Sequence, residues 1–324
     1  MTIPNVVSDA AHCPVGLIRA VDTVHADRAV RRGRWVRIVR GVYADADDYR
    51  SLPPWDRYLT RVHAVGLAWP GSVFVRESAA ALRGLPVFGE PPMVHVVVPA
   101  PQKSRTKRGI HVHSATRSPA IEQLGALRVC GAAETIVDMA RERHPAVALA
   151  IACAALRDGH LTSIDDAVRV HDRALSTRGR RRAEWVFDRA SATPESTLEA
   201  VSLAVIEWLG FPRPELQKWI FGPDGADDDR LDFWWDRWRI GGEADGGVKY
   251  SGALGDARAA LRARNARDAR LGERGVSATA HWTWADVSAP RQLRAMLRAA
   301  GLPLTGPEHT ELLRTLAAAL RGRA

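Results

Sequence analysis

The segment between Pro194 and Asp245 constrains the fold of this chain most, because two hydrophobic periodicities follow each other there. An apolar helical stripe runs from Leu198 to Leu209 and ends at Gly210. Turn-forming residues then separate three short strand patterns, at residues 217–221, 230–235 and 239–245. This order predicts a helix packed on a sheet and places the chain in the mixed α/β (α+β) class.

Acidic residues fall on these predicted elements at positions that bring them together. The two-residue alternation of a strand puts Glu243 and Asp245 on one face, and a hairpin partner places Asp232 beside them. Pro194 suits the first helical turn, so Glu195 is expected in that turn at the same end. Carboxylates that converge repel each other strongly unless a cation lies among them.

Oxygen ligands of this kind suit Mg²⁺ or Mn²⁺. Such an ion polarises a phosphate and lowers the pKa of an attacking water, so the acids predict phosphodiester hydrolysis. The alternative interpretation is that they are only the polar edges of a hairpin. The neighbouring run at residues 227–229 is interpreted as a solvated turn.

The charge balance favours a phosphate-bearing partner. The 324 residues carry a net charge of +9 and a pI of about 10.1, mainly through arginine. A guanidinium grips phosphate with two donors, although a genome that favours arginine codons would also enrich this residue. The chain exceeds one typical domain, and we expect two or three.

A basic hairpin is predicted near the N-terminus. Val21, Val24 and Val30 form a rough helical stripe that Gly33 ends, and residues 35–40 then alternate apolar with basic before a glycine turn. This arrangement is typical of a winged helix that presents arginine to DNA, and a solvated hairpin is the alternative. The predicted DNA contacts are Arg31, Arg32, Arg34, Arg37 and Arg40.

The middle of the chain mixes strands and helices. Residues 91–100 and 109–115 are predicted strands, and the second carries His111 and His113 on one face. These histidines could bind a metal, but an exposed edge strand is the favoured interpretation. Helices are expected at residues 132–143, 145–157 and 163–171, followed by a basic linker at 176–190.

The first half of the chain resembles the AbiEi family of antitoxins from type IV toxin–antitoxin systems. The resemblance is carried by the stretches AVRRGRWVRIVRGVYA (29–44), VHVVVPA with GIHVHSA, AAETIVDMA (132–140) and ALRDGHLT (155–162). It implies a winged helix that binds DNA and a cognate toxin as a second partner.

The C-terminal part is similar to nucleases related to very-short-patch-repair endonucleases, within the PD-(D/E)xK restriction-like superfamily. The similarity spans about residues 190–288 and is carried by Glu195-Ser196, Gln217, Leu231-Asp232-Phe233, Glu243-x-Asp245-Gly246, RDARLGERGV (267–276) and HWTWADV (281–287). It implies metal binding by Asp232 and Glu243 with support from Glu195. It also implies roles for Asp245 and Lys249, and a Gln217 that places water or substrate.

Three positions depart from the pattern of that superfamily. Asp245 replaces the lysine that usually follows the glutamate by two residues, and Lys249 stands where relatives often have histidine. Gly241 and Gly242 replace bulky aliphatic residues, and a glycine inside a strand weakens it by roughly 0.5–1 kcal/mol. A bulge at these glycines could move Glu243 away from its metal position.

The remaining features complete the prediction. A basic amphipathic helix at residues 256–275 is expected to contact DNA through Arg267 and Arg270. Three unpaired cysteines and the absence of a long apolar run favour a cytoplasmic protein that does not cross a membrane.

The chain is predicted to begin with the winged helix (1–44) and the AbiEi-like α/β domain (45–175), followed by the basic linker (176–190). The restriction-endonuclease-like mixed sheet flanked by helices (191–288) and a helical tail (289–324) complete it. Two functions are compatible with them. One is a Mg²⁺- or Mn²⁺-dependent DNA endonuclease. The other is a DNA-binding antitoxin or repressor with a degenerate nuclease fold.

Overall fold

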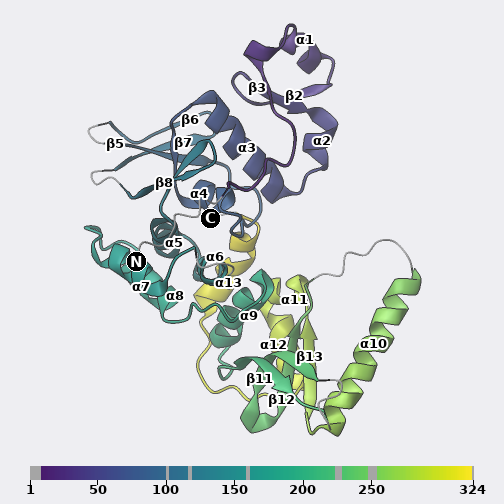
Figure 1. The fold of residues 1–324 in the computed structure, drawn as a ribbon. Helices are drawn as coiled ribbons and strands as arrows, with labels where there is room; N and C mark the ends of the chain where they lie inside the picture. The colour runs from purple at the N-terminus through teal and green to yellow at the C-terminus, as the bar shows by residue number, and fades with distance from the viewer. Residues whose placement is uncertain are drawn as a thin grey trace, which may run out of the picture. The chain divides into compact units, whose positions relative to one another are not determined.

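The computed structural model describes residues 9–99, 102–115, 119–157, 161–222, 228–246 and 254–322. Within these residues, helices surround three sheets, which confirms the mixed α/β class (Figure 1). The chain divides into two compact units. The first comprises Met1–Arg143, His160–Glu184 and Ala319–Ala324, and the second comprises His144–Gly159 and Trp185–Ala318.

A small three-stranded sheet opens the first unit. Its order is β1 (Ile18–Arg19), β3 (Val42–Asp45) and β2 (Trp35–Val39), so the predicted hairpin is present. Two short helices accompany it, α1 (Ala26–Arg31) and α2 (Ala46–Ser51). The predicted valine stripe is wrong, because Val21 and Val24 precede α1 and are 82% and 83% exposed. His25 adopts a left-handed conformation with φ of 72° and stops the helix from extending backwards.

A six-stranded sheet forms the centre of the first unit, in the order β6-β7-β5-β4-β9-β8. Its strands are β4 (Val73–Phe74), β5 (Val94–Pro99), β6 (Arg105–Lys107), β7 (Ile110–Ala115), β8 (Ile121–Leu124) and β9 (Leu127–Cys130). The two predicted strands β5 and β7 are present and run parallel to each other. The edge-strand interpretation of β7 is wrong, because β6 pairs with its other side.

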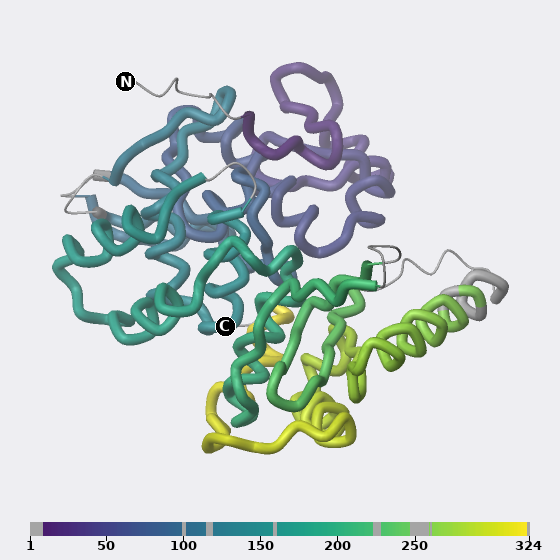
Figure 2. The backbone as a smooth tube through the Cα atoms, turned by 60° about the horizontal axis from the view of Figure 1, so that its bottom comes forward, coloured from purple at the N-terminus to yellow at the C-terminus, as the bar shows by residue number. Residues whose placement is uncertain are grey.

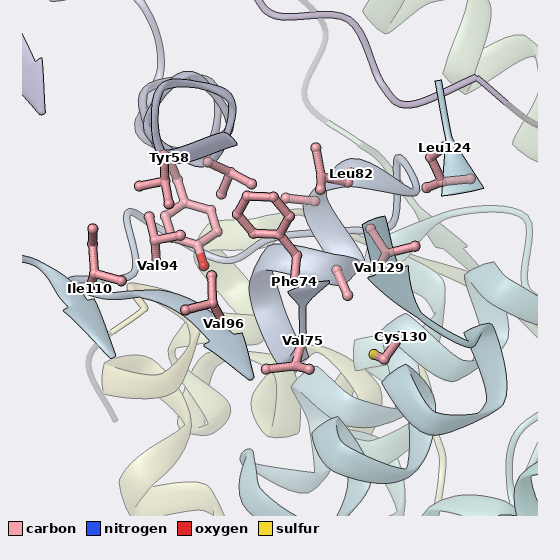
Figure 3. Close-up of a cluster of buried hydrophobic side chains, with 14 of the residues drawn as sticks. Tyr58, Phe74, Val75, Leu82, Val94, Val96, Ile110, Leu124, Val129 and Cys130 are labelled. Carbon is pink, nitrogen blue, oxygen red and sulfur yellow. The ribbon is translucent and has the colours of Figure 1, made fainter. Parts of the chain in front are cut away.

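Helices α3 (Pro54–Ala68) and α4 (Arg76–Leu82) supply side chains to the core beside this sheet. Tyr58, Phe74 and Val96 meet there with no exposed surface above 2%, as Figure 3 shows. The predicted helices are present as α5 (Ala132–Glu142), α6 (Pro145–Leu156) and α7 (Ile164–Asp172). The predicted basic linker contains a further helix, α8 (Arg180–Phe187).

The second unit is built on a four-stranded sheet in the order β10-β11-β12-β13. These strands are β10 (Glu215–Ile220), β11 (Asp229–Trp235), β12 (Ile240–Ala244) and β13 (Ala278–Trp282). The first three are antiparallel, whereas β12 and β13 are parallel and are joined through α10 (Leu254–Glu273). The other helices of this unit are α9 (Thr197–Trp208), α11 (Trp284–Ser288), α12 (Pro290–Ala299) and α13 (Thr310–Leu320).

The Gly241–Gly242 pair lies in a regular part of β12. Gly242 pairs with Phe233 on one side and with Ala280 on the other, and neighbouring pairs keep the same registers. A Cβ atom on Gly242 would lie 2.6 Å from Cη2 of Trp282, and one on Gly241 would lie 2.9 Å from Cδ1 of Leu231. The bulge that these glycines could have allowed is therefore absent from β12, and neighbouring side chains fill the space that a bulky residue would occupy.

Helix α10 packs on the sheet through its C-terminal half. Leu271 is fully buried, while residues 261–266 are all exposed. Figures 1 and 2 show the other end of the helix extending away from the strands of this unit. None of the described helices is both long and apolar enough to cross a membrane.

Candidate functional site

Two predicted metal ligands, Asp232 and Glu243, lie on neighbouring strands of the second unit. Oδ2 of Asp232 accepts a hydrogen bond of 2.9 Å from the backbone N–H of Ala244, the residue after Glu243. Burial raises the pKa of Asp232, and the charge of Glu199 raises it further. Burial and then the charge of Asp232 raise the pKa of Glu243 to about 7. The two carboxyl groups therefore resist being ionised together.

Gln217 lies across from Asp232. The pairs Leu216↔Phe233 and Lys218↔Leu231 flank it, and its backbone adopts a left-handed φ of 54°. Its side-chain N–H donates to Oε2 of Glu199 at 2.8 Å. Its Oε1 is buried and accepts no hydrogen bond from any described residue. A buried amide oxygen in this state is a favourable position for a donor or a cation.

Glu199 is a member of this group that the sequence reasoning missed. Ser196 caps α9 by accepting a hydrogen bond from the N–H of Glu199 at 3.1 Å, so Glu199 occupies the first turn. The carboxylate is buried, with 5% of the residue exposed. The Ser-x-x-Glu spacing is that of a capping box and could have located both the helix start and this acid.

Glu195 does not lie in the first helical turn as predicted. It precedes the N-cap residue Ser196, and its carboxylate pairs with Arg230 at 2.6 Å while remaining 51% exposed. Only its backbone N–H reaches the group, donating to Glu199 at 2.8 Å. The prediction is wrong because it took Pro194 as the helix start, whereas Ser196, two residues later, provides the cap.

Asp245 lies beside the group but is engaged elsewhere. It pairs with Arg264 of α10 and lies 3.6 Å from Nδ1 of His281. His281 in turn contacts Asp268 at 3.1 Å. The charge of Asp245 nevertheless contributes to the raised pKa of Glu243. Lys249, the other predicted catalytic residue, lies outside the described residues.

Arginines of α10, and Arg274 directly after it, enter the same region. Arg267 lies 3.0 Å from Oε1 of Glu243 and also donates to Asp229 at 3.0 Å. Arg270 and Arg274 reach Asp229 at 3.2 Å and 3.1 Å. Asp229 is buried, so the solvated-turn interpretation is wrong for this residue. The two arginines predicted to contact DNA, Arg267 and Arg270, are held by carboxylates here.

The donors match the way in which magnesium is commonly bound. Among the described residues, no group of three or more His, Cys, Asp or Glu side chains could hold a metal ion. Mg²⁺ generally needs only one or two carboxylates, because water and substrate phosphates complete its shell. Asp232, Glu243 and the free amide oxygen of Gln217 supply a set of that kind.

The other predicted site residues lie in the first unit. Arg31, Arg32, Arg34, Arg37 and Arg40 are all exposed. His111 and His113 stack at 4.2 Å between ring centroids, and Nε2 of His113 lies 2.9 Å from Nδ1 of the buried His95. Burial, followed by the charge of Arg76, lowers the pKa of both His95 and His113 to about 3. These two rings are therefore neutral at physiological pH.

No family model, no curated protein and no solved structure matches this chain. The resemblances to the antitoxin and nuclease families therefore remain predictions from the sequence.

Proposed function

We propose that this protein is a DNA endonuclease whose second unit hydrolyses phosphodiester bonds with Mg²⁺ or Mn²⁺. The observation that carries the proposal is the pair Asp232 and Glu243 on neighbouring strands: burial raises the pKa of both carboxyl groups, and the charge of Asp232 raises that of Glu243 further. A divalent cation would relieve this repulsion and favour the ionised form of both groups.

Each residue of the proposed site would have its own role in catalysis. Asp232 and Glu243 would hold the ion, and the amide oxygen of Gln217 would bind either the ion or an attacking water. The ion supplies charge stabilisation of the scissile phosphate and a more acidic water. Glu199 would orient Gln217 through their hydrogen bond of 2.8 Å. Arg267, at 3.0 Å from Glu243, supplies a positive charge where the superfamily lysine is absent.

The first unit would deliver the enzyme to DNA. The five exposed arginines of α1 and the β2–β3 hairpin lie within ten residues of sequence, a density that suits contact with the phosphate backbone. The net charge of +9 adds a long-range attraction to any polyanion. The cytoplasm is the compartment in which this activity would be expected.

Cleavage of supercoiled plasmid DNA in Mg²⁺ or Mn²⁺ tests the nuclease proposal. We expect Asp232→Ala and Glu243→Ala to abolish cleavage, because each removes a ligand of the ion. Glu273→Ala is the control, since this exposed acid of α10 lies outside the acidic cluster. Equal background cleavage from the wild type and all three variants would reject the proposal.

A second candidate function is a DNA-binding antitoxin or repressor whose nuclease fold is degenerate. It is favoured by Arg267 and Arg264, which pair with Glu243 and Asp245 and so supply positive charge without a metal. In that case a gel shift with promoter DNA would persist without divalent metal, and a cognate toxin would co-purify.

The hairpin variant Arg37→Ala/Arg40→Ala examines the shared DNA-binding part of both candidates. We expect its DNA affinity to fall and the salt dependence of binding to become shallower, because two phosphate contacts are lost. Arg50→Ala is a control on α2, where the arginine already pairs with Asp47. Unchanged affinity and salt dependence in the double variant would remove the hairpin from the DNA interface.

A further inference from the structure

Two aromatic side chains stand exposed at the edge of the second unit's sheet. Trp219 of β10 is 49% exposed, and Phe221, directly after the strand, is 69% exposed. The other large aromatic residues of this sheet, including Phe233, Trp234 and Trp282, are buried to 2% exposure or less. An exposed aromatic pair has a cost in water that a ligand would remove.

The two rings are nearly parallel and lie close together. Their centroids lie 6.5 Å apart and their planes differ by 16°. Nearly parallel rings this close together present flat apolar faces on which a planar group can stack. Side chains two residues apart on a strand project from the same side, which keeps the rings together.

A charged neighbour lies beside Trp219. Arg230 is the β11 partner of Trp219, and its guanidinium lies 5.6 Å from the centre of the tryptophan ring. Glu195 fixes Arg230 through their ion pair at 2.6 Å. The acid that the sequence assigned to the metal site therefore positions a cation beside an exposed ring.

The edge of β10 is poorly suited to pairing with another strand. Gln217 adopts a left-handed conformation in its middle, and Lys218 and Glu215 place a charged pair on it. Bends and charges of this kind protect edge strands from adding a partner strand. A planar ligand is therefore a better occupant than a second protein chain.

We propose that Trp219 and Phe221 form a base-stacking platform for single-stranded DNA, with Arg230 as its cationic neighbour. Every base has a flat face, so stacking on aromatic rings accepts any sequence, and an arginine attracts the phosphates. Trp219 follows Gln217 by two residues, a separation of roughly 7 Å along the strand. The proposal rests on the proposed nuclease function, because it assigns unpaired DNA as the substrate bound beside the acidic cluster.

Binding of fluorescent oligonucleotides in EDTA tests the platform without requiring cleavage. The probes are a single-stranded oligo(dT), an abasic strand of the same length and a duplex. We expect the wild type to prefer oligo(dT) over the abasic strand. Trp219→Ala and Phe221→Ala should each weaken oligo(dT) binding roughly 10-fold and leave the abasic strand unaffected, because only base stacking is lost. Trp219→Phe should retain the preference.

Trp55→Ala is the matched control, since Trp55 is a tryptophan of similar exposure, 51%, in the first unit. Unchanged oligo(dT) affinity in both alanine variants would overturn the platform. So would an equal loss on all three probes, because that would indicate phosphate contact alone. Light scattering that shows a wild-type dimer and a monomeric Trp219→Ala/Phe221→Ala variant would assign the surface to self-association instead.

Failure of the two proposals can be told apart. If plasmid DNA is not cut but the base preference depends on Trp219, the nuclease proposal fails and the platform stands. If Asp232-dependent cleavage occurs and both alanine variants bind oligo(dT) like the wild type, the platform fails and the nuclease stands.

Discussion

Two groups of acids in the second unit differ in how their charge is balanced. Asp229, at one end of β11, is surrounded by Arg267, Arg270 and Arg274 at 3.0–3.2 Å. Three residues later on the same strand, Asp232 meets Glu243 and Glu199, and Arg267 is the cation at 3.0 Å from Glu243. The first group has an excess of positive charge and the second an excess of acids.

This difference separates a structural role from a ligand-binding one. A buried carboxylate among several guanidinium groups is satisfied by the fold itself and anchors α10 to the sheet. Burial and the charges of neighbouring acids raise the pKa of both Asp232 and Glu243, so ionising them together is unfavourable in the isolated protein. They gain most from an added cation, so the shortage of positive charge distinguishes the candidate site from the anchor.

The largest expected effect comes from removing the anchor. Asp229→Ala removes the anion that three partly buried arginines share, and we expect a loss of about 3–5 kcal/mol in the free energy of unfolding. Urea denaturation followed by tryptophan fluorescence measures it. Asp228→Ala is the control, because this neighbouring side chain is exposed and accepts one hydrogen bond, from Gly222. Equal stability of the two variants would contradict the anchor role.

The next largest loss of stability is expected when a methyl group is added at Gly242, on the strand that carries Glu243. Gly242→Ala places a Cβ 2.6 Å from Cη2 of Trp282, and the overpacking should cost about 1–3 kcal/mol of stability. Gly246→Ala is the control, since no atom lies within 4 Å of its added Cβ. Thermal unfolding compares the two. If Gly242→Ala is as stable as the wild type, Trp282 does not fill this space as described.

Replacing Glu243 with glutamine is expected to increase the free energy of unfolding in metal-free buffer, by less than the two losses above. Its pKa of about 7 lies above the ordinary 4.5, so the unfolded chain loses this proton first and stability falls as pH rises from 4.5 to 7. Glu243→Gln should remove that fall and be about 1–2 kcal/mol more stable than the wild type above pH 7. Glu273→Gln, an exposed α10 acid, is the control. A destabilised Glu243→Gln would mean that its pair with Arg267 behaves like the Asp229 anchor.

The smallest effect is expected at Glu195. Its ion pair with Arg230 is half exposed, so Glu195→Gln should change the free energy of unfolding by less than about 0.5 kcal/mol. The same variant should weaken oligo(dT) binding measurably, because Arg230 is no longer held over Trp219. A large stability loss would place Glu195 with the buried acids after all.

The parts of this fold that local patterns encode were predictable. Alternation of apolar and polar residues located β11 and β12, and it placed Asp232 beside Glu243 because hairpin strands must pair. The helix start was misplaced because Pro194 and Ser196 are both acceptable starts, and only the glutamate three residues after the serine decides between them. Because Pro194 was taken as the helix start, Glu195 was predicted in the site in place of Glu199.

Other features depend on contacts between distant residues. Asp229 ends an acidic run with the composition of a solvated turn. It is buried because arginines 38 to 45 residues later in the chain reach it. The sequence makes Gly241 and Gly242 look like a weak point, because the side chains that fill the space beside them, Leu231 and Trp282, lie on the two neighbouring strands. His95 was missed because its ring partners, His111 and His113, lie on the neighbouring strand β7 rather than nearby in sequence.

The parallel pairing of β12 with β13 has a consequence during protein synthesis. Gly242 reaches its packed state only beside Trp282, which the ribosome adds 40 residues later, and the α10 arginines must be made before β13. A nascent chain that ends before residue 278 has the acids of the site but lacks the strand that holds Glu243 in line. The acidic cluster is therefore assembled late, after the exposed arginines of the N-terminal hairpin have left the ribosome.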